Sequence, residues 1–137
     1  MIREHGGLAV ARTPRRWFDA IVVQTSRILS LVPLAVLVLV VSHALHVRLF
    51  LGRWPVVYRD EPDSFLLNVH ARAIIAGVFA TYYGMPAWAA AVVVGVVRGQ
   101  APAREIAAHI AGIAAGLGGL LLLAAVDRTG YFEWFID

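Results

Sequence analysis

The sequence predicts an all-α integral membrane protein with three transmembrane helices and a short N-terminal interfacial helix. Hydrophobic residues make up 60% of the 137-residue chain and charged residues only 15%, whereas roughly a quarter of the residues in a soluble domain are charged. Three apolar segments reach the roughly 20 residues that a membrane helix needs, and none of them contains Asp or Glu. A helix satisfies its backbone polar groups internally in lipid, so we expect all three to be α-helical.

The N-terminal segment, residues 1–27, is predicted to be cytoplasmic and interfacial. Within it, "RRWFDAIVVQ" places Trp17, Phe18 and Ile21 on one helical face, which suits a short helix lying on the membrane surface. The alternative is that these aromatic residues begin the first span, at headgroup level. The other predicted elements are a first span over 28–51, an outer loop over 52–70, a second span over 71–97, a cytoplasmic loop over 98–105, a third span over 106–126 and an outer aromatic tail over 127–137.

The first span also has features of a cleaved secretory leader, with basic residues before it and small residues near its end. Such a leader would extend to about Ala44, whereas leaders usually have roughly 15–30 residues. We therefore expect the span to be retained.

Arginine placement predicts the orientation. All 12 basic residues are arginine, and together with many Ala, Gly and Val residues this indicates a GC-rich, bacterial coding sequence. Seven arginines lie on one side of the spans and five on the other. The side with more positive charge is normally cytoplasmic, which places the N-terminus in the cytoplasm and the C-terminus in the periplasm, in the inner membrane. The arginines are spread along the chain, so they predict no nucleic-acid partner.

Small residues recur at every fourth position in two spans. Such rows let membrane helices approach closely, and two rows on one helix exceed what one partner within the chain requires. We therefore expect other integral-membrane subunits, or further copies in a homo-oligomer, to cover part of this surface. The alternative is that these rows only reflect the composition of membrane helices in GC-rich genomes. The rows contain Ala107, Ala111, Ala115 and Gly119, then Ala108, Gly112 and Gly116, and in the second span Ala87, Ala91 and Gly95.

Three histidines lie near the outer ends of the first two spans. His43 and His46 share a helical face, and His70 starts the second span from the same side. Imidazoles from facing helices can hold a haem b, or a metal ion with a third nitrogen ligand. The alternative is an ordinary polar rim, because polar side chains at helix ends reach the interface at little cost.

His109 is separate from this group and lies on the cytoplasmic side. It faces the same way as Gly112 and Gly116, so one interpretation is a hydrogen bond across a helix interface. The other interpretation is that His109 is the axial ligand of a pigment macrocycle that lies against the small residues. Glu105, one turn earlier in the sequence, disfavours this interpretation.

Aromatic residues outside the spans are predicted to anchor the chain at the membrane surfaces. The alternative for the C-terminal aromatics is that this tail docks on a larger neighbour. The anchors are Trp17, Phe18, Trp54, Tyr131 and Trp134.

The chemistry available to the chain is narrow. It has no cysteine, which excludes disulfides, thiolate metal sites and covalent haem attachment. A transporter normally needs acidic or paired charged residues in the middle of the membrane. No acidic residue lies within any of the three spans. We therefore predict a non-catalytic accessory or structural subunit of a larger bacterial inner-membrane complex, respiratory or photosynthetic. The alternative is a haem b-binding electron-transfer or membrane-anchor subunit that uses His43, His46 and His70.

Overall fold

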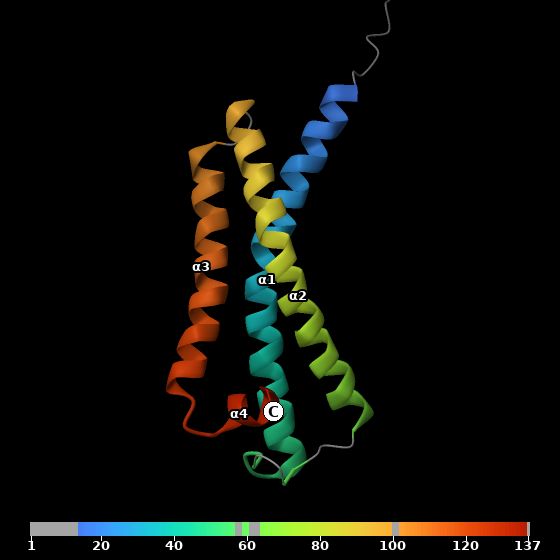
Figure 1. Cartoon of the computed structure of the whole chain (residues 1–137), viewed down its shortest axis with the longest axis vertical. Coiled ribbons are helices and arrows are strands. Elements are labelled where there is room, and N and C mark those ends of the chain that lie inside the picture. The colour runs from blue at the N-terminus through green and yellow to red at the C-terminus, as the bar shows by residue number, and fades with distance from the viewer. Residues whose placement is uncertain (1–13, 57–58, 61–63, 100–101, 137) are drawn as a thin grey trace, which may run out of the picture.

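The computed structural model describes residues 14–56, 59–60, 64–99 and 102–136. This part of the chain forms four helices, which are α1 (Pro14–Leu51), α2 (Phe65–Val97), α3 (Ala103–Val126) and α4 (Tyr131–Ile136). Helices α1, α2 and α3 run along the long axis of the molecule, and the short α4 lies at one end (Figure 1). The predicted all-α class is confirmed.

Three helices are long and apolar enough to cross a membrane, over Ala20–Leu51, Phe65–Val97 and Ala103–Val126. Helix α2 has 33 residues and is therefore about 50 Å long at 1.5 Å per residue. The hydrocarbon core of a bilayer is about 30 Å thick, so α2 extends past it. The chain is a multi-pass membrane protein.

The prediction of a short, separate interfacial helix near the N-terminus is wrong. Helix α1 is continuous over 38 residues from Pro14, so the segment before Ile28 is the first part of the same helix that spans the membrane. Proline is favoured at the first helical position, and no Gly or Pro follows until Pro33. The hydropathy of the sequence predicts the start of the apolar segment, whereas the helix itself begins earlier in the chain.

Helices α2 and α3 also begin before the predicted starts of their spans at 71 and 106. Helix α2 starts at Phe65, after Ser64 in extended backbone geometry with φ −122°. Helix α3 starts at Ala103, after Pro102 with φ −66°. Polar residues such as Asn68 and Arg72 in the first turns of α2 are exposed, so they fit a helix end that projects beyond the lipid.

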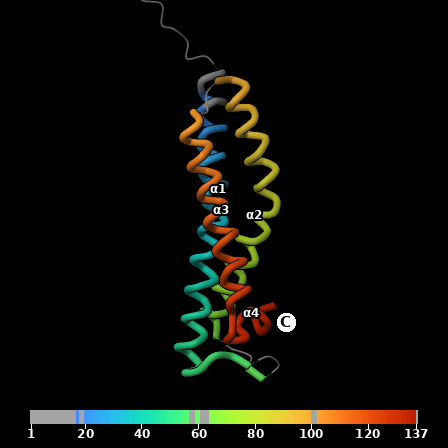
Figure 2. Tube along the Cα trace, turned by 90° about the vertical axis from the view of Figure 1, so that its left-hand side faces the viewer, coloured from blue at the N-terminus to red at the C-terminus, as the bar shows by residue number. Residues whose placement is uncertain are grey.

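Helix α1 is the centre of the bundle. Helices α2 and α3 each pack along α1. In Figure 1 α2 crosses in front of α1, and in Figure 2 it lies to one side of both α1 and α3. Only 6% of the most apolar window of α2 is buried inside the molecule. The core is consequently small and lies around Val36, Val40, Ile74 and Tyr131.

Glycines bring the backbones of the helices together. A Cβ on Gly116 would collide with the backbone of Pro33 and Leu34, and a Cβ on Gly112 would lie 3.3 Å from the Ser30 carbonyl oxygen. On α2, a Cβ on Gly77 would lie 2.7 Å from a methyl group of Val36. These approaches depend on the absence of side chains, as in close-packed membrane helices generally.

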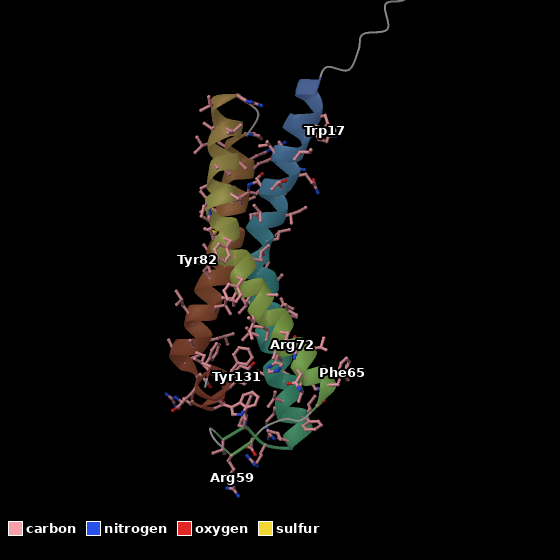
Figure 3. All side chains as sticks on the ribbon, turned by 45° about the vertical axis from the view of Figure 1, so that its right-hand side comes forward. Trp17, Arg59, Phe65, Arg72, Tyr82 and Tyr131 are labelled. Carbon is pink, nitrogen blue, oxygen red and sulfur yellow. The ribbon has the colours of Figure 1, made fainter. Side chains whose placement is uncertain are left out.

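Polar contacts connect the helices at both ends of the bundle. At the end near Trp17, here called the Arg27 end, Arg27 on α1 forms a 2.8 Å ion pair with Glu105 on α3. At the other end, here called the α4 end, α4 packs against α1 together with the loop that contains Arg59 (Figure 3).

Candidate functional site

A buried polar cluster lies at the α4 end. His43 on α1 is only 1% exposed, and its Nδ1 lies 2.7 Å from the hydroxyl of Tyr131. Trp134 stacks on the imidazole at a centroid distance of 6.3 Å, and Phe135 meets it edge-on at 5.4 Å. The aromatic tail therefore folds back onto its own bundle and encloses His43.

The start of α4 is fixed by Asp127. Its carboxylate accepts hydrogen bonds of 2.8 Å from the backbone N–H of Phe132 and 2.9 Å from that of Thr129. Partial burial opposes ionisation of this carboxyl, but these hydrogen bonds outweigh it and hold the pKa of Asp127 below its usual value. An acidic group is favourable at a helix N-terminus because of the unpaired N–H groups there.

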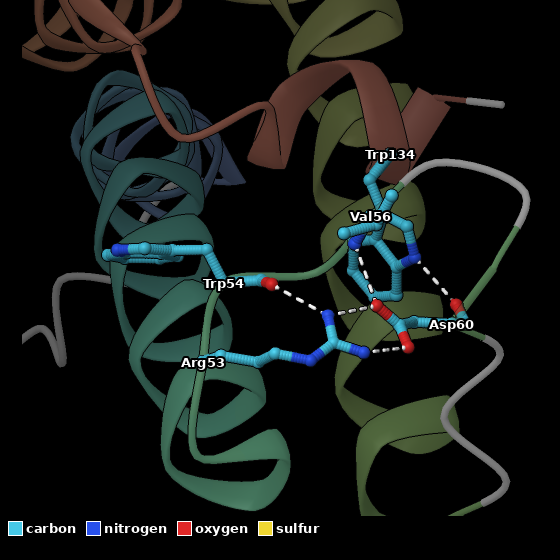
Figure 4. A network of polar contacts seen from close by, with 5 residues as sticks. All are labelled: Arg53, Trp54, Val56, Asp60 and Trp134. Carbon is cyan, nitrogen blue, oxygen red and sulfur yellow. Dashed lines mark hydrogen bonds and ion pairs between the residues drawn. The ribbon is translucent and has the colours of Figure 1, made fainter.

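The loop between α1 and α2 joins the same assembly (Figure 4). Trp134 donates a 2.7 Å hydrogen bond from Nε1 to the Asp60 carbonyl. The Asp60 carboxylate in turn pairs bidentately with Arg53, at 2.6 and 2.7 Å, and this hydrogen bonding holds the pKa of Asp60 below its usual value. Helix α4 is therefore held by α1 and by the loop together.

The structure brings the three outer histidines together. His43 and His70 are in edge-to-face contact with ring centroids 5.0 Å apart, and His46 and His70 are 6.3 Å apart. His70 Nε2 is hydrogen-bonded to the Ser42 hydroxyl at 3.0 Å. They therefore share one level of the bundle, as the sequence predicts.

As arranged, these imidazoles do not fit a haem. The axial ligands of a haem lie on opposite faces of the macrocycle, whereas His43 contacts His70 directly and bonds Tyr131 through Nδ1. The cavity beside His43 has a volume of about 220 Å³, below the roughly 300–1,000 Å³ of ordinary small-molecule sites. No group of three or more His, Asp or Glu residues within the described ranges could hold a metal ion.

His109 lies at the Arg27 end, beside a small cavity where the three long helices meet. Its Nδ1 is buried and has no hydrogen-bond partner within the described part of the chain. The cavity has a volume of about 20 Å³, room for about one water molecule and not for a macrocycle. Gly112 and Gly116 pack against α1, so they leave no flat surface beside His109 for a pigment.

A larger groove lies between α2 and α3, with α1 as its floor. Its volume is about 1000 Å³, and it arises because α2 and α3 pack on α1 and hardly on each other. Val36 and Tyr82 lie close to the midpoints of their spans, Ala20–Leu51 and Phe65–Val97, so the groove opens in the middle of the membrane. It is lined by Val36, Val78, Thr81, Tyr82, Tyr83, Met85, Pro86, Ala89, Leu117 and Leu120.

Two tyrosines on the α2 wall of this groove face outward. Tyr82 is 72% exposed and Tyr83 is 68% exposed; Figure 3 shows Tyr82 on the surface of α2. Their rings contact each other at 5.1 Å, but neither hydroxyl has a hydrogen-bond partner in the described part of the chain. A hydroxyl without a partner in hydrocarbon costs several kcal/mol, so this surface favours a neighbour with hydrogen-bond acceptors.

The small residues predicted to pack helices divide into two groups. One group is buried or partly buried within the bundle. The other is exposed and remains available on the outside of α2 and α3. The first group is Gly112, Gly116, Gly119, Ala91 and Gly95; the second is Ala107, Ala108, Ala111, Ala115 and Ala87.

The predicted interfacial anchors have different environments. Trp17 is 72% exposed near the start of α1, and Trp54 is 37% exposed just after the end of α1, so both suit a membrane surface. Tyr131, in contrast, is 3% exposed and belongs to the core, and Trp134 stacks on His43. The side chain of Phe18 lies outside the described residues.

The most specific contacts at the α4 end and the tyrosine pair of the α2–α3 groove are not predicted from the sequence. The sequence predicts Tyr131 and Trp134 as interfacial anchors, and its patterns do not single out Tyr82 and Tyr83. The signal for the tyrosine pair was available, since two hydroxyl-bearing residues near the centre of a span need partners.

The comparisons with known proteins add no family or relative: no protein-family model, no curated protein and no solved structure matches this chain.

Proposed function

We propose that this chain is a non-catalytic accessory or structural subunit of a larger bacterial inner-membrane complex, and that the α2–α3 groove receives a transmembrane helix of a neighbouring subunit. One observation carries the proposal, which is the open groove in the middle of the membrane with the unpartnered hydroxyls of Tyr82 and Tyr83 at its wall. A respiratory or photosynthetic assembly is the kind of complex we expect.

The dimensions of the groove favour a helix as its occupant. One turn of an α-helix is about 5.4 Å long and 10–12 Å across and fills roughly 400–600 Å³. The groove, at about 1000 Å³, therefore accommodates about two turns. The Tyr82 and Tyr83 hydroxyls would donate hydrogen bonds to polar groups of the incoming helix, which stabilise helix association in lipid.

Orientation and location rest on arginine placement. The N-terminus is proposed to lie in the cytoplasm and the C-terminus in the periplasm, with the α4 end on the periplasmic side. In this proposal the histidine cluster is a structural contact that packs under the aromatic tail, and it takes no part in electron transfer. The alternative haem-binding function is less well supported, because His43 and His70 contact each other directly and the cavity beside His43 is small.

The test is purification of the tagged full-length chain from its native membranes in mild detergent. The co-purifying subunits are identified and an absorption spectrum is recorded on the same sample. We expect a colourless chain that co-purifies with one or more membrane subunits. A chain that arrives alone, or only with copies of itself, would contradict the proposal. A chromophore that stays with the isolated chain would also contradict it.

A matched pair of variants tests the groove itself. Ala89 lines the groove, whereas its exposed neighbour Ala90 is not among the lining residues. Ala89→Trp is expected to fill the groove and release the partner, and Ala90→Trp is expected to leave the complex intact. Equal loss or equal retention of the partner in both variants would place the contact elsewhere.

A further inference from the structure

A second groove lies at the α4 end, between α1 and α3. Its volume is about 340 Å³, less than the roughly 400–600 Å³ of a single helical turn. Its walls are apolar, with Val41 and Leu45 from α1 and Leu123 and Val126 from α3. The groove is thus much smaller than the α2–α3 groove, and its narrow apolar walls suit a flexible hydrocarbon chain.

The mouth of this groove carries positive charge. Arg128 lines the groove and is exposed. Arg48 lies over Trp54, another lining residue, with Cζ 5.9 Å from the ring centroid. The nearby Asp127 carboxylate is occupied by the backbone N–H groups of Thr129 and Phe132. The mouth therefore offers two guanidinium groups, while its one carboxylate is already hydrogen-bonded.

The mouth also lies at the depth of lipid headgroups. Helix α3 ends at Val126, and Arg128 lies two residues beyond it. Trp54 comes just after the end of α1, and tryptophan is typical of the membrane–water interface. Basic sites beside transmembrane helices bind anionic lipid headgroups. Charge and depth agree at this position.

We propose that this groove binds one anionic phospholipid, with an acyl chain between α1 and α3 and its phosphate held by Arg128 and Arg48. The acyl chain covers apolar surface of Val41, Leu45 and Val126 that is exposed in the isolated chain. The lipid contacts α4 through Tyr131 and Phe132, which also line the groove. It therefore ties the aromatic tail to the bilayer. This site is separate from the α2–α3 groove and does not depend on the proposed function.

The test measures lipid binding to the delipidated full-length protein in detergent by native mass spectrometry. Phosphatidylglycerol is the anionic probe, and phosphatidylcholine is the zwitterionic comparison. We expect the wild-type protein to retain one phosphatidylglycerol molecule in preference to phosphatidylcholine. Arg128→Gln should weaken that binding about fivefold, the ratio that about 1 kcal/mol per arginine at an anionic surface gives.

Two further variants separate the site from non-specific effects. Ala44 lines the groove, so Ala44→Trp should abolish retention of the lipid. Arg59 is exposed in the loop and lies outside the groove, so Arg59→Gln should bind as the wild type does. Thermal unfolding of each variant shows that it is folded. If Ala44→Trp does not fold, the exposed Arg128→Gln substitution still tests the site.

Three results would overturn the proposal. Equal retention of phosphatidylglycerol and phosphatidylcholine would show that the groove does not select charge. Full binding by both Arg128→Gln and Ala44→Trp would place the lipid elsewhere. A peptide segment of a co-purified subunit cross-linked to Leu123 would show that protein occupies the groove.

Discussion

The hydroxyl of Tyr131 lies 2.7 Å from Nδ1 of His43, a residue 88 positions earlier in the chain. Both side chains are almost fully buried. This hydrogen bond joins the C-terminal helix α4 to the central helix α1, and it gives the buried His43 side chain a polar partner.

Removal of the Tyr131 hydroxyl should therefore release α4. Tyr131→Phe leaves His43 Nδ1 buried without its partner, which costs about 1–3 kcal/mol. Hydrogen exchange in detergent should show faster exchange in α4 and little change in the middle of α1. A variant with unchanged protection of α4 would show that packing alone holds the tail.

The same tyrosine should resist ionisation. Burial, and then the negative charge of Asp127, raises the pKa of Tyr131 above its usual value. Because the folded-state pKa is raised, the stabilisation is complete below about pH 10, the unfolded value, and is lost as the pH rises through the folded value. The phenolate absorbance of Tyr131 is obtained by subtracting the absorbance of Tyr131→Phe from that of the wild type. This difference should therefore appear only well above pH 10, at the pH at which α4 is released. Titration of this difference at an ordinary tyrosine pKa would contradict the burial of the phenol.

A low pH should also weaken the contacts at the α4 end. The pKa values of Asp127 and Asp60 are lowered in the folded chain, so their stabilisation is present above their unfolded value of about pH 4 and is lost as the pH falls below it. We expect the fluorescence contribution of Trp134, obtained by difference from Trp134→Phe, to change below about pH 4 while helical circular dichroism persists. Asp127→Asn, which keeps an acceptor but no charge, should show a weaker acid response. The same acid response in wild type and Asp127→Asn would show that Asp127 is not the titrating group.

Two glycines on α3 provide a direct test of helix packing. A Cβ on Gly116 would collide with the backbone of Pro33 and Leu34, whereas a Cβ on Gly118 would meet nothing within 4 Å. Gly116→Ala should lower the free energy of unfolding by about 1–3 kcal/mol through overpacking. Gly118→Ala should be neutral or stabilising by up to about 1 kcal/mol, because alanine is the better helix former. Thermal unfolding in detergent distinguishes the two, and equal midpoints would mean that α3 does not approach α1 at Gly116.

The ion pair at the Arg27 end should contribute little. Arg27 and Glu105 have side chains 50% and 29% exposed, and exposed pairs contribute roughly 0.2–1 kcal/mol. Arg27→Gln should therefore shift the unfolding midpoint far less than Gly116→Ala. A larger loss would indicate that the pair is shielded from water in the membrane.

Hydropathy and residue spacing predict the three spans because each is a long apolar segment free of acidic residues. They do not predict the start of α1 at Pro14, since a helix can continue into water beyond the lipid. Small-residue rows predict close helix contacts but not which row faces inward. Gly116 packs on α1 while Ala115 beside it is exposed, and both rows are equally small in the sequence.

The contacts of α4 cannot be predicted from the sequence for a different reason. An aromatic tail and a histidine near a helix end each have a sufficient local explanation at a membrane surface. Only the backward turn through Asp127 and Gly130, where φ is +73°, brings Tyr131 to His43. The groove between α2 and α3 likewise depends on how the helices splay around α1, which spacing within one helix does not encode.

The most direct test of the partner-binding groove is photo-cross-linking in native membranes. A photoreactive phenylalanine analogue replaces Tyr82, which lines the groove, or Leu66, which is exposed at the α4 end of the same helix. We predict a cross-link from position 82 to a transmembrane segment of another protein, and no cross-link to such a segment from position 66. Lipid adducts alone from position 82 would contradict this prediction.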